Sequence, residues 1–330
     1  MEPFNVLISS AGRRVALLRI FREALRELGL RGKVFAADAS PVSGAFHDAD
    51  GSWQAPRCTE PEFVPWMLEL CRRERIRLVA PTIDTELPAY ASHRDAFAAQ
   101  GTIVAVSSPE TIAIGNDKVR THAWLTAEGF PTVRQQSAEQ ALACGGRGWP
   151  LPLIVKPRFG SASIGVQRID NLEQLHVLPR HVEYIVQTIA PGCEYTIDVL
   201  VDRRGQCLCA VPRKRLEVRG GEVSKGMTER QESLVSLGSR LAEALPGAYG
   251  VLNIQVFWDL AAETASVIEI NPRFGGGFPL TWQAGGRYPQ WIIEEILGRP
   301  STVSSGDWSD RLLMLRFDDA VFVPAALVEL

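Results

Sequence analysis

The sequence of 330 residues lacks several features that would assign it to a common protein class at once. It has no run of about 18 apolar residues, so it predicts no transmembrane helix. Its start, MEPFNVLISS, lacks the basic residues and long apolar stretch of a signal peptide. It has no long basic run, and 35 lysines and arginines against 38 aspartates and glutamates leave a net charge of −3. These absences predict a cytoplasmic protein with no membrane partner and no nucleic-acid partner.

The cysteines and histidines do not form a recognisable zinc site. The six cysteines include no CxxC pair, and the five histidines are scattered along the chain. Cys207 and Cys209 would lie on one face of a strand, but zinc needs more ligands than these two. We therefore expect reduced, mostly buried cysteines, with Cys193 as a packing residue beside Glu194.

Two common nucleotide-binding loops are also missing. The segment SSAGR at 9–13 follows the first expected strand, but it is not GxGxxG. The loop FGSASIG at 159–165 is not followed by the Lys-Ser/Thr of a Walker loop. An NAD-dependent oxidoreductase is therefore not favoured.

Strands and helices alternate over the first third of the chain. This alternation is typical of parallel βαβ units and predicts a Rossmann-like α/β lobe. Ligands of such sheets bind beyond the carboxyl ends of the strands, where Asp38, Asp84 and Glu86 fall. The expected strands are 5–9, 33–37, 77–80 and 102–106, and the expected helices are 14–28 and 62–75.

After about residue 115 the strands and helices segregate, which predicts an α+β region. A helix begins at NDK, residues 116–118, and another spans 229–245. The basic segment 213–230 is interpreted as a loop that either closes over anions or extends into water. Residues 311–317 and 320–323 suggest a late hairpin. The expected strands are 153–157, 182–187, 194–201, 206–212, 252–258 and 265–271.

The stretch VIEINPRFGGGFP at 267–279 places Glu269, Asn271 and Arg273 on one face of a strand. Carboxylate and amide oxygens are ligands that suit Mg²⁺. Pairing with the preceding strand, LNIQV, can bring Gln255 alongside Glu269, and the adjacent arginine can balance phosphate charge. The three glycines are expected to let the backbone approach a ligand. The alternative is an ordinary exposed strand face.

Three further segments carry weaker signals. Lys156 emerges from an apolar strand, where burial without an anionic partner is costly, and the small-residue loop after it can cradle phosphate oxygens. The alternative is a solvent-exposed lysine before a turn. Lys118 is either a phosphate ligand or a solvated helix lysine. The turn from Gln187 to Glu194 can hold a flat base through its backbone, or it is a plain surface hairpin.

The order NDK, VKP with a glycine loop, VQxxxxGxE, NIQ and EINPR resembles the ATP-grasp superfamily, specifically one ATP-binding half of the carbamoyl phosphate synthetase large subunit. The resemblance covers nearly the whole chain, including NVLISSAGRR and PTIDTEL. It implies an ATP-grasp fold of α+β type with a small mobile lid, following the Rossmann-like lobe. The implied domains are a Rossmann-like domain at 1–115, a lid subdomain with its linking helix at 116–188, and a catalytic subdomain at 189–330.

The resemblance also implies roles for individual residues. Arg273, Lys156 and Arg215 would be catalytic by offsetting phosphate charge. Mg²⁺, with Mn²⁺ as the alternative, would be held by Gln255, Glu269 and Asn271, where many relatives have Asp in place of Gln255. ATP would be bound by Lys118, Lys156, Gly160, Ser161, Ser163, Gln187, Thr188, Ile189 and Glu194.

The implied activity is that of an ATP-dependent carboxylate–amine ligase, which forms an amide through an acyl phosphate and releases ADP. The partners are then a small-molecule carboxylate and an amine, with Asp84 or Glu86 as candidate amine ligands and a homodimer as a possible assembly. The chain carries motifs for a single ATP site, so carbamoyl phosphate synthesis by this chain alone is not expected. A small-acid kinase and a non-catalytic nucleotide-binding subunit are the alternatives.

Overall fold

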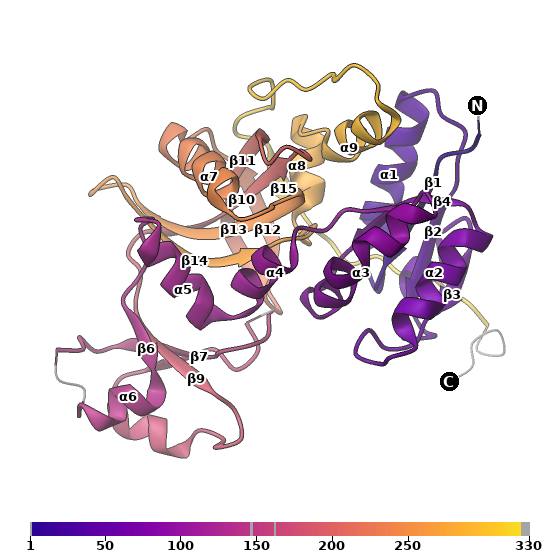
Figure 1. Ribbon diagram of the computed structural model, residues 1–330. Helices are drawn as coiled ribbons and strands as arrows, with labels where there is room; N and C mark the ends of the chain where they lie inside the picture. Colours follow the sequence, from indigo (N-terminus) through magenta and orange to yellow (C-terminus); the bar gives the residue numbers. More distant parts are fainter. Residues whose placement is uncertain (1, 146–147, 162, 325–330) are drawn as a thin grey trace.

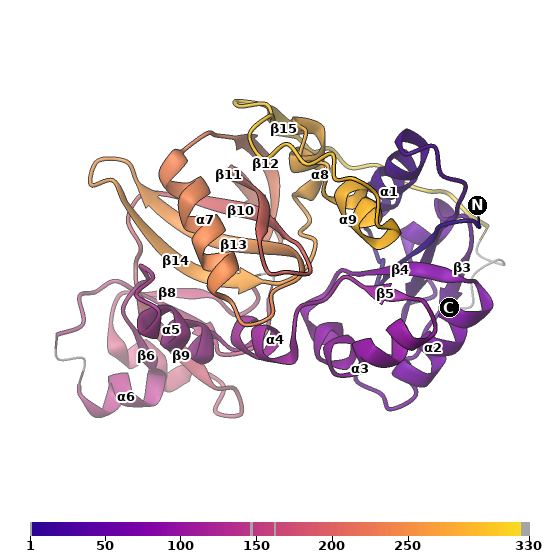
Figure 2. The same ribbon diagram turned by 45° about the horizontal axis from the view of Figure 1, so that its top comes forward.

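Three β-sheets organise the chain, whose computed structural model describes residues 2–145, 148–161 and 163–324. The six-stranded sheet lies between the other two, with the parallel sheet at one end of the molecule and the four-stranded sheet at the other (Figures 1 and 2). This arrangement places the functional residues predicted above around the middle sheet.

The parallel sheet forms the N-terminal lobe, with strand order β3-β2-β1-β4-β5. Its central strand β1 is buried on both faces, with Val6, Leu7 and Ile8 fully buried, which explains its continuous apolar sequence. The strands are β1 (Asn5–Ser9), β2 (Val34–Asp38), β3 (Ser52–Gln54), β4 (Ile76–Pro81) and β5 (Ile103–Val104). The helices are α1 (Val15–Glu27), α2 (Phe63–Arg73) and α3 (Leu87–Ala99), with 3₁₀ turns η1 (Gly44–His47) and η2 (Asp84–Glu86).

The six-stranded sheet is antiparallel, with strand order β14-β13-β10-β11-β12-β15. Helix α7 (Glu232–Ala244) packs on β10 and β11 through its apolar face. The strands are β10 (Cys193–Val201), β11 (Cys207–Arg219), β12 (Glu222–Thr228), β13 (Gly250–Asp259), β14 (Thr264–Asn271) and β15 (Leu313–Leu315). Helices α8 (Phe278–Ala284) and α9 (Tyr288–Leu297) follow β14 and lie against α1.

The four-stranded sheet has the order β6-β9-β7-β8 and its own small apolar core with α6 and η3. Helices α4 (Pro109–Asn116) and α5 (Lys118–Ala127) lead into it and pack against β14. Its elements are β6 (Gln135–Ser137), α6 (Ala138–Ala143), β7 (Leu153–Pro157), β8 (Gln167–Ile169), η3 (Leu172–Val177) and β9 (Tyr184–Thr188).

A chain of aromatic rings joins the N-terminal lobe to the middle sheet. Phe21 of α1 lies 5.6 Å from Phe274, and Phe274 lies 4.9 Å from Phe278, both between ring centroids. These rings belong to one buried cluster that also contains Trp282 and Tyr288. The two lobes therefore share a core, whereas the four-stranded sheet has a separate one.

The fold agrees with the predicted α/β lobe followed by an α+β region, and it corrects several details. The segment 213–230 is not a loop, because it forms most of the β11–β12 hairpin, with Arg213 buried against Asp198. The late hairpin is also wrong: β15 pairs with β12, and residues 320–323 form no strand. Of the six free cysteines, Cys71 and Cys209 are buried, so the expectation of mostly buried cysteines is wrong. Cys193 is exposed, which also corrects its interpretation as a packing residue.

Within the described ranges, no helix combines the length and apolarity needed to cross a membrane. The same part of the chain contains no group of three or more His, Cys, Asp or Glu side chains placed to hold a metal. This finding does not concern metal sites that use the amide oxygens of Asn or Gln, because it covers only His, Cys, Asp and Glu side chains.

Candidate active site

Two adjoining cavities contain all the residues predicted to bind ATP, to hold the cation or to be catalytic. The central cavity, of about 350 Å³, lies between the N-terminal lobe and the six-stranded sheet. The lid-side cavity, of about 250 Å³, lies between the six-stranded and four-stranded sheets. Gln255 and Glu269 line both cavities, so they form part of the wall between them. Arg215, Asn271 and Arg273 line the central cavity, and the predicted ATP residues line the lid-side cavity.

The predicted metal ligands lie side by side because of the register of β13 and β14. Gln255 pairs with Glu269, and Asn253 pairs with Asn271. Since side chains alternate across a strand, all four project from the same face of the sheet. The register predicted from the sequence is confirmed for Gln255 and Glu269. One carboxylate and neighbouring amide oxygens form a donor set that a hard cation such as Mg²⁺ accepts.

Lys156 lies next to the last residue of β7 and is 6% exposed. Burial lowers the pKa of its ammonium group to about 8, although Glu269 and Glu194 act in the opposite direction. Burial of a charged ammonium group is costly because the group loses its hydration. An anionic ligand beside Lys156 would offset this cost. Lys156 lines the lid-side cavity together with Lys118.

Lys118 is the first residue of α5 and is also buried, which excludes the solvated alternative. Its Nζ donates a hydrogen bond to the carbonyl oxygen of Gly160 at 2.6 Å. This bond ties the helix to the small-residue loop, in which Gly160 and Ser163 have positive φ angles. Within the predicted loop 159–165, Ala162 lies outside the described residues.

The turn between β9 and β10 forms one side of the lid-side cavity through Gln187, Thr188 and Ile189. Gln187 is held by a hydrogen bond from its Nε2 to Gln135 at 2.7 Å. Glu194 follows the first residue of β10, and its Oε1 lies 3.3 Å from Nε of Arg215 on the adjacent strand. Burial raises the pKa of Glu194, while Arg215 opposes that effect.

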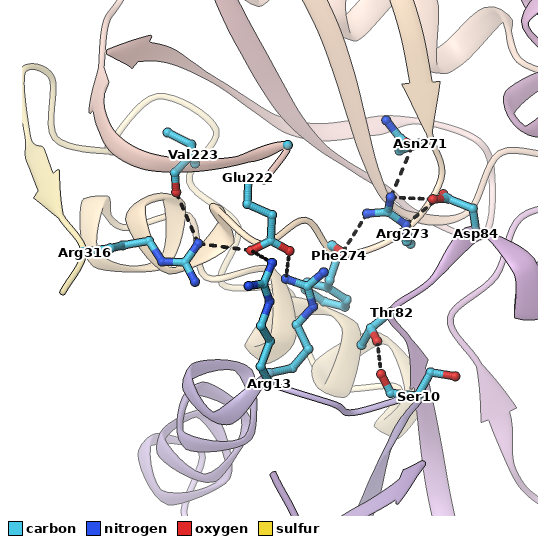
Figure 3. Close-up of polar contacts among 12 residues, drawn as sticks. Ser10, Arg13, Thr82, Asp84, Glu222, Val223, Asn271, Arg273, Phe274 and Arg316 are labelled. Atoms are coloured by element: carbon cyan, nitrogen blue, oxygen red, sulfur yellow. Dashed lines mark hydrogen bonds and ion pairs between the residues drawn. The ribbon is translucent and has the colours of Figure 1, made fainter. Parts of the chain in front are cut away.

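Arg273 makes a bidentate pair with Asp84 across the two lobes. Its Nε donates to one carboxylate oxygen of Asp84 at 2.8 Å, and its Nη2 donates to the other at 2.6 Å (Figure 3). The same Nη2 lies 3.3 Å from Oδ1 of Asn271. Burial lowers the pKa of Arg273, but the carboxylate of Asp84 outweighs this effect and raises it. The sequence did not predict this pair, because its members lie 189 residues apart.

The three glycines after Arg273 fit tightly against other side chains. A Cβ at Gly275 would clash with the Asn253 amide, and one at Gly277 would clash with the Arg213 guanidinium. A Cβ at Gly276 would meet Arg14 and Glu222 at 2.6 Å. The close approach expected at these glycines is therefore made to the protein's own polar side chains.

Glu86 does not reach the central cavity, which corrects its assignment as an amine ligand. It is fully buried, and its Oε1 accepts hydrogen bonds from the backbone N–H groups of Thr82 and Ile83 at 2.6 and 3.2 Å. Its Oε2 accepts from the hydroxyls of Ser9 and Ser10 at 2.5 and 2.8 Å. Burial raises the pKa of Glu86. Of the three acids at the strand ends, Asp84 is the one that lines the central cavity.

A group of charges at the central cavity, apart from Asn271 and Arg273, was missed (Figure 3). Glu222, at the start of β12, lies 2.8 Å from Arg14, 3.3 Å from Arg13 and 3.2 Å from Arg316. We call these four residues the Glu222 cluster. Its members come from three segments separated by about 90 to 200 residues, and sequence spacing alone gives no sign that such distant residues meet. The visible signal was the pair of arginines in SSAGRR.

Comparisons with known proteins agree with this geometry. Residues 115–277 match the model of an ATP-grasp domain, and residues 6–105 match that of a PylC-like N-terminal domain. The chain therefore contains an ATP-grasp domain, preceded by a PylC-like N-terminal domain. The narrower resemblance to carbamoyl phosphate synthetase stays a prediction.

Solved structures similar to this ATP-grasp chain share its fold at low sequence identity. The ADP complex of N5-carboxyaminoimidazole ribonucleotide synthetase has a TM-score of 0.73 at 15% identity, covering 91% of this chain and 79% of that one. The L-amino acid ligase of Bacillus licheniformis has a TM-score of 0.67 at 18% identity, covering 92% and 76%. The biotin carboxylase domain of Hydrogenobacter thermophilus 2-oxoglutarate carboxylase, solved with MgADP, has a TM-score of 0.72 at 17% identity, covering 95% and 74%.

A curated relative, carnosine synthase 1 of Gallus gallus, is 25% identical over 176 residues. The match covers 45% of this ATP-grasp chain and 18% of that protein. The chain therefore corresponds to less than a fifth of that relative's length.

Proposed function

We propose that this protein is an ATP-dependent carboxylate–amine ligase that forms an amide through an acyl phosphate and releases ADP and phosphate. The observation that carries the proposal is the position of Gln255 and Glu269, which line both cavities. A reaction between the terminal phosphate of ATP and a second substrate needs a site where two compartments meet beside a cation. The names of the similar proteins, which include ligases, support the same class.

ATP would occupy the lid-side cavity. The backbone of residues 187–189 would face the adenine, and Glu194 would accept hydrogen bonds from the ribose hydroxyls. Lys118, Lys156 and the N–H groups of the loop with Gly160, Ser161 and Ser163 would hold the phosphates. Two buried lysines in one cavity are suited to a polyanion, because its charge offsets their desolvation.

The donor set on β13 and β14 fits Mg²⁺, with Mn²⁺ as an alternative. Glu269, Asn271 and Gln255 would hold the cation, which when bound would offset the negative charge of the phosphates. Gln255 is neutral where many relatives have Asp. The site would therefore carry one formal negative charge, on Glu269.

In the first step a carboxylate oxygen of one substrate attacks the γ-phosphorus of ATP, and the bond from that phosphorus to the β–γ bridging oxygen breaks, releasing ADP. Lys156, Arg215 and Arg273 would offset the charge on the transferring group. In the second step an amine nitrogen attacks the acyl carbon, phosphate leaves, and the amine proton passes to phosphate or solvent. Closure of the four-stranded sheet over the nucleotide would exclude water, which otherwise hydrolyses the acyl phosphate.

The test is a turnover assay with MgATP and a panel of paired carboxylates and amines, using the full chain. ADP formation that depends on both substrates, together with a new mass of the condensed amide, is the expected result. ADP formation with a carboxylate alone, yielding an acyl phosphate, would instead support the kinase. AMP as the nucleotide product, or failure to bind adenine nucleotides, would overturn the proposal.

A further inference from the structure

The charges that line the central cavity are paired unevenly. Arg213 pairs with Asp198, Arg215 lies beside Glu194, and Arg273 pairs with Asp84, so each has a carboxylate of its own. In the Glu222 cluster, by contrast, three guanidinium groups share one carboxylate (Figure 3).

The Glu222 carboxylate is ionised at neutral pH. Burial raises its pKa, but Arg14 and Arg13 outweigh this effect and lower it below the ordinary value. The cluster therefore has two more positive than negative charges. Arg14 and Glu222 are the most enclosed members, with side chains 18% and 17% exposed, so water screens their charge less than that of surface residues.

Two other features favour a negative ligand here. Helix α1 begins directly after Arg14, and it has neither a side-chain cap nor an acidic residue in its first turn, so its dipole is uncompensated at this end. Burial and the neighbouring cations Arg273 and Arg13 lower the pKa of Arg14, while Glu222 opposes them. The arginine is thus held in an environment where more negative charge would be stabilising.

We propose that the Glu222 cluster binds an anionic group, a carboxylate or a phosphate, carried by one substrate at the end remote from its reacting atom. This inference rests on the proposed ligase function and specifies its substrate class. The reacting group would lie at the end of the cavity with Glu269 and Asn271, and the anionic group would lie at the end with Arg13 and Arg14. Arginine suits this role because its planar fork binds carboxylate and phosphate oxygens in pairs.

The first experiment measures binding without turnover. The full chain, saturated with MgADP, is titrated calorimetrically with dicarboxylates from malonate to adipate and with their monoamides. Amino acids are compared with their amides, and amino alcohols with their phosphate esters. We expect at least one dianion, amino acid or phosphate ester to bind roughly 10- to 100-fold more tightly than its neutralised counterpart. The ligand series that shows this difference in affinity identifies the class of substrate and whether its anionic group is a carboxylate or a phosphate.

Variants then assign the difference to the cluster. Arg14→Gln is expected to remove the preference for the charged ligand, and Arg14→Lys to restore part of it. Arg19→Gln is the matched control, because Arg19 lies on α1 with its side chain 58% exposed, pairs with Asp48 and does not line the central cavity. MgADP affinity, which depends on the lid-side cavity, should be unchanged in all three.

Equal binding of charged and neutralised ligands throughout the panel would overturn the proposal. An Arg14→Gln variant that weakens both members of a pair equally would do the same. If charged ligands bind preferentially but no pair supports ADP formation, the anion site stands and the ligase function fails. If ADP forms equally well with neutralised substrates, the ligase function stands and the anion site fails.

Discussion

Arg273, which follows β14 of the six-stranded sheet, donates two parallel hydrogen bonds of 2.8 and 2.6 Å to Asp84 of the N-terminal lobe. The guanidinium group is positioned two residues after Asn271, and its Nη2 lies 3.3 Å from the amide oxygen of that residue. The position of the N-terminal lobe is thus linked to the geometry of the predicted cation site.

Asp84→Ala should destabilise the protein, because it leaves a largely buried guanidinium without its carboxylate. We expect the free energy of unfolding to fall by roughly 2–5 kcal/mol, measured by urea denaturation. Asp95→Ala is the control, since the Asp95 side chain on α3 is fully exposed and its contact with Arg94 is 4.0 Å long. If Asp84→Ala lowers the free energy of unfolding by less than about 0.5 kcal/mol, the ion pair with Asp84 does not stabilise the buried Arg273 side chain.

Glu269→Gln should abolish most of the ADP formation, because it removes the one carboxylate of the predicted cation site. We expect a decrease in kcat of about 100- to 1,000-fold and a higher Mg²⁺ concentration for half-maximal activity. Glu263→Gln, at the exposed turn between β13 and β14, should leave both values unchanged. Wild-type turnover by the Glu269 variant would contradict the assignment.

Lys156 predicts a pH dependence of stability in the absence of nucleotide. Its pKa falls from 10.5 to about 8 on folding because of burial, so the folded chain resists protonating this group. Below pH 8 the lysine is charged in both states and its full cost of burial applies, which is roughly 3 kcal/mol. Between pH 8 and 10.5 the folded chain loses the proton first, and the cost is relieved as the pH rises.

Lys156→Met should therefore stabilise the nucleotide-free protein at pH 7, and its advantage over the wild type should shrink by roughly 2–3 kcal/mol at pH 10. Urea denaturation at both values measures this difference. The same variant should bind MgADP more weakly at pH 7, which separates the functional role of the charge from its structural cost. A difference in stability that does not change with pH would rule out the titration of Lys156.

Glu86→Ala should damage the N-terminal lobe without a selective effect on the amine substrate. The substitution leaves the backbone N–H groups of Thr82 and Ile83 and the hydroxyls of Ser9 and Ser10 without their acceptor. We expect the free energy of unfolding to fall by roughly 3–5 kcal/mol, followed by circular dichroism during urea titration. If the variant instead raises only the KM for the amine and leaves the free energy of unfolding unchanged, Glu86 binds the amine substrate and its structural role is wrong.

The sequence predicted the local features of the site well, because they depend on the alternation of side chains between the two faces of a strand and on short motifs. The alternation in EIN and NIQ predicted which side chains share a face, and the register of β13 and β14 follows from it. Asp117 caps α5 as NDK suggested, with Oδ1 accepting from the N–H of Val119. These features arise from residues close together in the chain.

Features that join distant segments could not be predicted in this way. Glu222 meets Arg14 across more than 200 residues, and Arg273 meets Asp84 across 189. The basic residues 213–215 resembled a loop because their charges hide the strand alternation, yet Arg213 is buried by its pair with Asp198. Helices α3 and α9 were missed, although both have a proline in the first turn, where it is tolerated.

The aromatic contacts between Phe21, Phe274 and Phe278 determine where the chain can be cut into stable fragments. Since these rings are buried in one cluster that spans both lobes, a fragment cut near residue 105 would expose apolar surface on each side of the cut. Limited proteolysis should therefore release the four-stranded sheet or its loops before it separates the other two sheets. Engineering of substrate range is best confined to side chains around the central cavity, because exchange of the whole N-terminal lobe with a homologue would disrupt this shared core.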